Sequence, residues 1–360
     1  MTTITEFIVD KNNLGQTRIA ERDAPTLNDG QVLAKVDRFA LTANNVTYGV
    51  VGERIGYWKF FPVEKDGDGI IPVWGFADII ESNHPDVPVG DRLYGYWPMA
   101  SHLVMSPTRI SEHRLFDGAE HRAELPPVYN SYSRVNAEPG YDNTFDDDRM
   151  VLLPLYATSF CLYDFMKDND WFGAEQILIP SASSKTAIGT AYAIKADDSA
   201  PVLVGLTSPR NKSAMDELAL YDIVLTYDQL DQIDASKPSA IIDMSGNGAV
   251  LNELHKRLGD NMKYTSNVGA THYEDNAMGP DFIRDRSQMF FAPGHIQKRN
   301  ADWGPGQFEQ KSLAFWRDAA IKSREWLTIK HETGATAVSD AWQEVYAGKT
   351  PPNAAWVVGF

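Results

Sequence analysis

The chain has 360 residues, of which 43% are hydrophobic and 23% charged, a composition typical of a globular protein large enough for two domains. Its formal net charge of −16 argues against nucleic acid and anionic membrane surfaces as partners. The single cysteine, Cys161, excludes a disulfide framework and a cysteine-rich zinc site. No apolar run is long enough to span a membrane and the N-terminus lacks a signal-peptide pattern, so we expect a cytoplasmic protein.

Short apolar runs broken by Gly and Pro occupy the first 150 residues and predict an antiparallel β domain. They cover residues 5–9, 31–39, 71–80, 92–96 and 102–105. Two polar stretches interrupt them. We expect residues 57–70 to form an exposed loop with an aromatic start. We expect residues 111–148 to form an insertion with partial order, a lid or a subunit contact.

A strand, a turn of small residues and a helix follow one another between residues 176 and 196, and together they predict a phosphate site. The helix start offers unpaired N–H groups and the positive end of the helix dipole to an anion. An ordinary serine-capped turn is the alternative. The turn contributes Ser181, Ser183, Ser184, Lys185 and Thr186 as candidate ligands, and the helical pattern begins at Ala187.

Four further apolar runs, at 202–206, 223–225, 240–243 and 264–268, alternate with helical segments such as 213–220 and 249–258. This alternation predicts an α/β fold with a doubly wound parallel sheet covered on both faces. Such sheets bind ligands at the carboxyl ends of their strands. The residues expected there are Ser208, Arg210, Lys212, Tyr227, Ser245, Val268 and Gly269.

The end of the second run distinguishes the two nicotinamide cofactors. An NAD site needs an acidic residue there for the ribose hydroxyls, and none lies between positions 204 and 212. Ser208, Arg210 and Lys212 suit a 2′-phosphate instead, which favours NADPH. A solvated surface loop is the alternative.

The remaining segments complete the pattern of alternating elements. We expect helices over residues 151–166, 305–325 and 335–346, and strands over 287–291 and 355–358. His295 follows the first of these strands and is expected at the surface, with a position in the cleft as the alternative.

Several local patterns resemble the medium-chain dehydrogenase/reductase superfamily, in particular its zinc-free quinone oxidoreductase and enoyl reductase branch. DGQVLAKV at 29–36 resembles the family strand GEVLVRV, and VGDRL at 89–93 matches x-G-D-R-V. The resemblance implies a GroES-like antiparallel β domain over residues 1–150, with the insertion at 111–148. It also implies a Rossmann NADPH-binding domain over 151–325 and a C-terminal segment, 326–360, that returns to the first domain.

The resemblance also implies roles for individual residues. In NADPH-dependent members a Lys after the second Rossmann strand and a Tyr ending the third bind the 2′-phosphate, and Lys212 and Tyr227 match these positions. NNVTY at 44–48, with Gly52 behind it, resembles N-x-x-D-T-Y-x-x-x-G, whose Tyr lies beside the nicotinamide. Tyr48 is therefore the candidate to hydrogen-bond or protonate a substrate carbonyl. A simple role in a pocket wall is the alternative.

The chain also departs from the family pattern. Phe76 and Ala77 replace the His and Glu of the zinc branch, so we expect no metal. The phosphate turn, usually G-A-x-G-G-V-G, here reads SASSKTA at 181–187. The resemblance implies a zinc-independent, NADPH-dependent reductase acting on a small enone, quinone or enoyl thioester, and we expect a homodimer. The lost glycines favour the alternative, a non-catalytic member that binds a nucleotide or a partner.

Overall fold

The computed structural model describes residues 2–269 and 278–360. The chain divides into two compact units, and each is described by itself. Unit 1 comprises Met1–Val151 together with Leu327–Phe360. Unit 2 comprises Leu152–Trp326.

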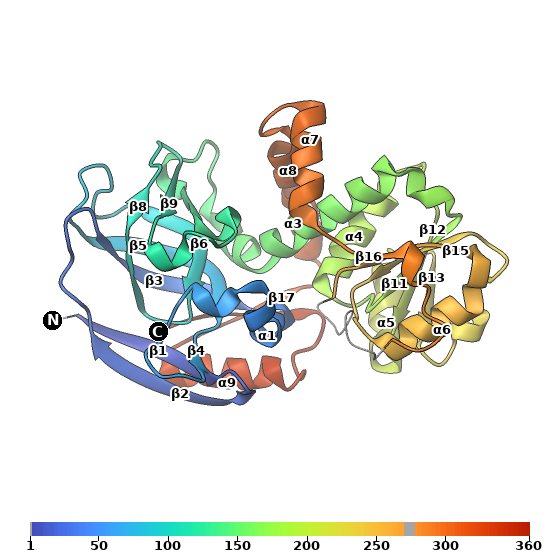
Figure 1. Ribbon diagram of the computed structural model, residues 1–360, viewed down its shortest axis with the longest axis horizontal. Helices are drawn as coiled ribbons and strands as arrows, with labels where there is room; N and C mark the ends of the chain where they lie inside the picture. The colour runs from blue at the N-terminus through green and yellow to red at the C-terminus, as the bar shows by residue number, and fades with distance from the viewer. Residues whose placement is uncertain (1, 270–277) are drawn as a thin grey trace. The chain divides into compact units, whose positions relative to one another are not determined.

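Unit 2 is built on a six-stranded sheet in which all neighbouring strands are parallel (Figure 1). Its order, β13-β12-β11-β14-β15-β16, reverses direction between β11 and β14. This is the strand order of a Rossmann fold, and ligands bind such sheets at the point of reversal. The strands are β11 (Gln176–Pro180), β12 (Val202–Thr207), β13 (Ile223–Thr226), β14 (Ser239–Asp243), β15 (Met262–Asn267) and β16 (Ser287–Met289).

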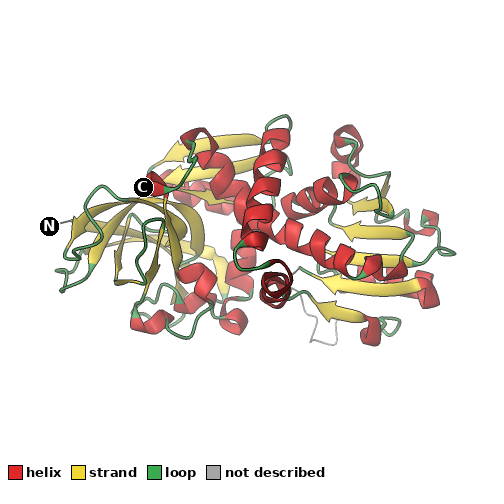
Figure 2. Ribbon diagram, turned by 90° about the horizontal axis from the view of Figure 1, so that it is seen from above, coloured by secondary structure: helices red, strands yellow, loops and turns green. Residues whose placement is uncertain are grey.

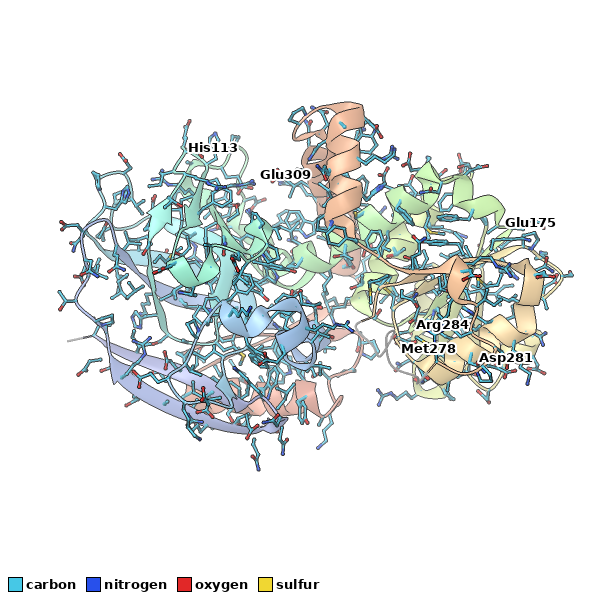
Figure 3. All side chains as sticks on the ribbon, in the orientation of Figure 1. His113, Glu175, Met278, Asp281, Arg284 and Glu309 are labelled. Carbon is cyan, nitrogen blue, oxygen red and sulfur yellow. The ribbon has the colours of Figure 1, made fainter. Side chains whose placement is uncertain are left out.

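Helices cover both faces of this sheet, which explains why its strands are apolar without alternation (Figure 2). Ile177 and Ile179 of β11 belong to a core with the α3, α4 and α5 helices, whereas Leu178 belongs to a second core with α6. Met278, labelled in Figure 3, and Phe282 lie in the second core. The helices are α3 (Asp146–Asp168), which begins in unit 1, and α4 (Lys185–Lys195), α5 (Pro209–Leu218), α6 (Gly248–Leu258), α7 (Ala292–Trp303) and α8 (Gln307–Ser323).

The helix α7 was not predicted from the sequence, and the expected surface position of His295 is wrong. His295 is 7% exposed, and its Nε2 lies 2.5 Å from the Asp164 carboxylate on α3. Arg299, one turn further along α7, holds the same carboxylate at 2.6 Å. A buried ion cluster therefore fastens α7 to α3, which is why this polar segment is ordered as a helix.

Unit 1 contains a three-stranded sheet, β2-β1-β4, and a nine-stranded sheet, β17-β18-β3-β5-β6-β10-β9-β8, with β7 added beside β3. All strand pairs are antiparallel except β17 with β18, which are parallel. The strands are β1 (Thr3–Asp10), β2 (Asn13–Asp23), β3 (Val32–Leu41), β4 (Asp68–Gly69), β5 (Pro72–Ser82), β6 (Arg92–Pro98), β7 (His102–Met105), β8 (Pro107–Thr108), β9 (Arg114–Asp117), β10 (Ser131–Arg134), β17 (Thr328–Thr333) and β18 (Ala354–Gly359).

The last 34 residues pack into unit 1 beside its N-terminal strands. Strand β18 pairs with β3, and α9 (Ala335–Tyr346) lies against β1 and β2. The indole N–H of the fully buried Trp342 donates to the Leu14 carbonyl at 2.8 Å, and its ring meets Phe7 edge-on. Two short helices, α1 (Ala43–Val50) and α2 (Gly52–Ile55), and 3₁₀ turns such as η1 (Tyr57–Lys59) and η3 (Pro127–Asn130) complete the unit.

The aromatic start of residues 57–70 is buried rather than exposed, whereas the acidic part, residues 64–67, is exposed as expected. Tyr57, Trp58, Phe60 and Phe61 are all buried, with 8% exposure or less. The Phe60 ring lies edge-on to Tyr96 of β6, 5.3 Å between centroids. The sequence did not predict the burial of these aromatic residues, because an acidic segment follows them. They fold back onto the sheet.

Residues 111–148 are ordered in strands and 3₁₀ turns rather than only partly ordered, and that they form an insertion or a lid stays a prediction. Strand β9 pairs with β10, and β10 pairs with β6, so this stretch extends the nine-stranded sheet. A buried ion pair joins Arg122 to Asp117 at 3.2 Å. Short polar strands of this kind give no clear alternation of apolar residues, which is why the sequence concealed them. Contact of this stretch with a second subunit stays a prediction.

None of the helices within residues 2–269 and 278–360 combines the length and the hydropathy that a membrane span requires.

Candidate functional site

The turn between β11 and α4 lies at the reversal point of the parallel sheet. The Ser184 N–H donates to the Ser181 carbonyl at 2.9 Å, which closes the turn. The Ser184 hydroxyl then accepts the Ala187 N–H at 3.3 Å and caps α4. The Ala182 N–H donates to the Leu206 carbonyl of β12 at 3.0 Å. The turn is therefore fixed both to its own helix and to the neighbouring strand.

Ser181 takes the left-handed backbone conformation, with φ at +60°, that a glycine would adopt without strain. Two tyrosines from either end of β13 hold this strained turn. The Tyr227 hydroxyl accepts the Ser181 N–H at 3.0 Å, and the Tyr221 hydroxyl donates to the Ala182 carbonyl at 2.8 Å. Tyr227, predicted as a cofactor ligand, thus lies directly at the turn.

The close approach that glycines usually give this turn comes from a glycine on the neighbouring strand. A Cβ added to Gly205 of β12 would lie 2.8 Å from the Tyr221 ring and 3.0 Å from the Ala182 Cβ. Ala182 itself is fully buried. The turn can therefore carry Cβ atoms because the strand beneath it carries none at this point.

Lys185 and Thr186 form the first turn of α4, which begins two residues earlier than the predicted helix start at Ala187. Burial lowers the pKa of the Lys185 ammonium from 10.5 to about 8. An anionic group beside this lysine would favour its charged form and raise its pKa again. The Thr186 carbonyl accepts the Ser159 hydroxyl of α3 at 2.8 Å, which ties the helix start to α3.

Arg210 and Lys212, two of the predicted 2′-phosphate residues, lie on a helix rather than a loop, since α5 begins at Pro209, earlier than predicted. Ser208 is the residue before the first turn, Arg210 is exposed, and Lys212 forms an ion pair with Asp216 at 2.7 Å. A phosphate bound here would compete with Asp216 for the Lys212 ammonium.

Asn211 is a residue that the sequence analysis missed. Its side-chain N–H donates to the Ser183 hydroxyl at 2.9 Å, and the Thr207 hydroxyl lies 3.3 Å from the same oxygen. Ser183 is 8% exposed and therefore faces the α5 side of the turn. The only sequence signal for this contact was the position of Asn211. It follows a Ser-Pro helix start, and this helix begins after the strand next to the serine turn.

The predicted residues after β14 and β15 come together around Asp243. Its carboxylate accepts the Ser245 N–H at 2.9 Å, and its backbone carbonyl accepts the N–H groups of Val268 and Gly269 at 2.9 and 3.0 Å. A Cβ on Gly269 would lie 2.9 Å from the Gly246 nitrogen, so these two loops touch. Burial raises the pKa of the Asp243 carboxyl.

Tyr48 belongs to unit 1 and lies on α1. It is 6% exposed, and its ring packs against Tyr57 and Tyr96 at centroid distances of 4.7 and 5.6 Å. Its hydroxyl oxygen accepts the indole N–H of Trp74 at 3.2 Å. Burial is the main cause that raises the pKa of Tyr48 far above its usual value, so the phenol is neutral at physiological pH.

The two asparagines before Tyr48 have different roles. Asn45 caps α1, because its side-chain oxygen accepts the Thr42 backbone N–H at 2.8 Å. Its side-chain N–H donates to the Pro72 carbonyl at 3.1 Å. Asn44, one turn before Tyr48, lies close enough to the phenol to lower its pKa. The structure therefore separates a structural asparagine from one that faces the candidate catalytic group.

Phe76 and Ala77 are fully buried in β5. Across the part of the chain that the structure describes, no three His, Cys, Asp or Glu side chains form a group that could hold a metal ion.

Solved structures share this fold over nearly their whole length. CurA from Vibrio vulnificus, crystallised with NADPH, superposes with a TM-score of 0.64 at 13% identity, over 99% of this chain and 98% of that chain. A mutant form of enoyl thioester reductase from Candida tropicalis gives 0.59 at 9% identity, over 100% of both chains. A putative NADPH:quinone reductase from Bacillus thuringiensis gives 0.58 at 11% identity, also over 100% of both.

The protein thus has the two-domain fold of the medium-chain dehydrogenase/reductase superfamily, a Rossmann domain together with a GroES-like domain. This confirms the fold class and the resemblance expected from the sequence. The chain belongs to the family described as "Protein of unknown function (DUF2855)", whose model matches residues 39–351. Comparison with curated protein sequences gives no match.

Proposed function

We propose that the protein is a zinc-independent, NADPH-dependent reductase that transfers a hydride to an activated alkene or carbonyl of a small molecule. The observation that carries this proposal is the turn at 181–184, held by Tyr227 at the reversal point of the Rossmann sheet. The likeness to a structure crystallised with NADPH and to named reductases supports it. When bound, NADPH supplies the hydride, and the protein supplies binding and orientation.

The residues present suit this cofactor. Lys185, Thr186 and the start of α4 would hold the pyrophosphate, because they combine a cation, a hydroxyl and helix-terminal N–H groups. Ser208, Arg210, Lys212 and Tyr227 would hold the 2′-phosphate. The turns that carry Ser245, Val268 and Gly269 would hold the rest of the dinucleotide, because they lie at the carboxyl ends of β14 and β15.

We further propose that Tyr48 donates a hydrogen bond or a proton to the substrate oxygen. Its phenol is neutral and surrounded by aromatic rings, so the hydrogen bond forms in a setting of low dielectric. Phe76 and Ala77 stand where the zinc branch has two metal ligands, so the phenol would take over polarisation of the carbonyl.

The first experiment measures NADPH and NADH binding by fluorescence. NADPH oxidation is then followed with a panel of quinones, enones, enoyl thioesters and aldehydes. On the best acceptor we expect Tyr48→Phe to lower turnover about 100-fold with unchanged NADPH affinity. Tyr94→Phe is the matched control, because the Tyr94 hydroxyl is buried in the same aromatic cluster but donates to the Arg149 carbonyl. Full activity of Tyr48→Phe would contradict the catalytic assignment.

A second candidate function is nucleotide binding without catalysis. The left-handed Ser181 and the absence of glycine from its turn favour it, because they depart from the pattern of active members. Tight NADPH binding without oxidation by any acceptor on the panel would support this alternative over the reductase.

A further inference from the structure

The hydrogen bond between Trp74 and Tyr48 has only one possible direction. The indole nitrogen of Trp74 lies 3.2 Å from the Tyr48 hydroxyl oxygen. An indole N–H donates and has no acceptor lone pair on its nitrogen. Tyr48 therefore accepts this bond, and the proton of its own hydroxyl remains to be donated to another group.

A phenol has one proton to donate. The indole N–H of Trp74 points at the Tyr48 oxygen, so the hydroxyl proton is directed away from Trp74.

The indole ring of Trp74 is held in place by its neighbours on the sheet. Trp74 of β5 is the direct cross-strand partner of Tyr96 on β6, and their ring centroids are 5.2 Å apart. Its ring also stacks on Tyr94, with centroids 5.8 Å apart and planes inclined by 24°. Trp74 is partly exposed, whereas Tyr94 and Tyr96 are buried. The N–H is consequently aimed by rigid packing rather than by a mobile side chain.

We propose that Trp74 is a positioning residue that makes Tyr48 an obligatory hydrogen-bond donor toward the substrate. This inference rests on the proposed function of Tyr48. It also defines the ligand chemistry. A hydroxyl oriented in this way donates to an acceptor such as a carbonyl oxygen, and it disfavours a ligand that presents an N–H or O–H donor at this point. Trp74 acts through Tyr48.

The bond itself can be tested without any ligand. The chain has nine tryptophans, whose indole N–H signals can be followed by ¹H–¹⁵N NMR. Trp74→Phe identifies one signal as that of Trp74. We expect Tyr48→Phe, which removes only the hydroxyl, to shift that signal upfield and to leave the signal of Trp97 in place, since the Trp97 N–H donates to the Gly75 carbonyl. An unchanged Trp74 signal would overturn the proposal.

The role in turnover is tested by a double-mutant cycle on the best acceptor. We expect Trp74→Phe to lower kcat about fivefold to tenfold when Tyr48 is present, and to have no further effect in the Tyr48→Phe background. NADPH affinity should be unchanged in each variant. Trp97→Phe is the control, and any loss it causes should be the same factor in both backgrounds.

Each outcome of the cycle supports or overturns a specific claim. The same loss for Trp74→Phe in both backgrounds would assign Trp74 a merely structural role and overturn the proposal. Full activity of Tyr48→Phe would overturn the function proposed for Tyr48 and the role of Trp74 with it. If Trp74→Phe folds poorly, β-(3-benzothienyl)alanine at position 74 keeps the bicyclic ring and replaces only the N–H by sulfur. This variant should reproduce the loss of kcat.

Discussion

Lys185 gives the most direct test of the phosphate turn, because its charge depends on whether an anion lies beside it. In the free protein burial lowers its pKa from 10.5 to about 8. The pyrophosphate of NADPH favours the charged ammonium and should return the pKa to at least its ordinary value. The bound state therefore holds a proton that the free state has lost above pH 8.

The size of the effect follows from these two pKa values. At pH 9 the Lys185 ammonium is about 9% protonated in the protein without NADPH and about 97% in the complex, so binding takes up about 0.9 proton. The sign is fixed, because the form with the higher pKa is the complex, and affinity must fall as pH rises through the free-state pKa. Between pH 7 and pH 9 the affinity for NADPH should fall about tenfold.

Calorimetry at pH 9 in two buffers of different ionisation enthalpy measures the proton uptake directly. Lys185→Met should abolish the uptake, flatten the pH dependence and weaken binding at pH 7 about tenfold or more. Lys195→Met is the matched control at the other end of α4, where the lysine pairs with Asp222. Wild-type protein that binds NADPH without proton uptake at pH 9 would refute the placement of Lys185 beside the cofactor.

Three further predictions concern other parts of unit 2. Lys212→Ala should weaken NADPH binding about tenfold to hundredfold and leave NADH binding unchanged, and equal losses in a fluorescence titration would remove Lys212 from the 2′-phosphate site. Ser181→Gly should change the free energy of unfolding by less than about 0.5 kcal/mol in denaturant titrations, because relieved strain and added chain entropy offset each other, whereas Ser181→Val should lose about 1–3 kcal/mol. Burial raises the pKa of Asp164, but hydrogen bonds from His295 and Arg299 outweigh this effect and lower the pKa overall. The cluster therefore stabilises the protein at pH values above the ordinary carboxyl pKa, and this stabilisation is lost as the pH falls and Asp164 is protonated. Asp164→Ala should then cost about 3–5 kcal/mol at pH 7, and a loss below 1 kcal/mol would show that the cluster is not structural.

The strands and turns of the Rossmann unit could be predicted from the sequence, because each depends on a short contiguous pattern of residues. A strand buried on both faces needs an unbroken apolar run, and Ile177, Leu178 and Ile179 supply it to two different cores. The turns that end such runs must lie at one edge of the sheet. The order of elements and the candidate turns around Tyr227 and Gly269 therefore follow from pattern alone, although the start of α5 at Pro209 did not.

Unit 1 was less readable because its order depends on contacts between distant residues. Tyr57 and Phe60 are buried against Tyr96 and Tyr129, which lie far along the chain. Strand β10 is short and polar, and it is defined by its pairing with β6. The partner of Tyr48 was hidden for the same reason, since Trp74 is 26 residues away and reaches the hydroxyl only through the register of β5.

The glycine-free turn shows why a motif read along one segment underestimates this site. Glycines in such a turn permit a left-handed residue and a close approach of neighbouring atoms. Here Ser181 takes the left-handed conformation while the Tyr227 hydroxyl binds its N–H. Gly205 on the adjacent strand has no Cβ, and this leaves room for the Ala182 side chain. Residues on or beside the neighbouring strands therefore permit the close packing that glycines in the turn usually permit. Lys185 can then occupy a position where the family has glycine, and it brings a positive charge to the place where a phosphate would bind.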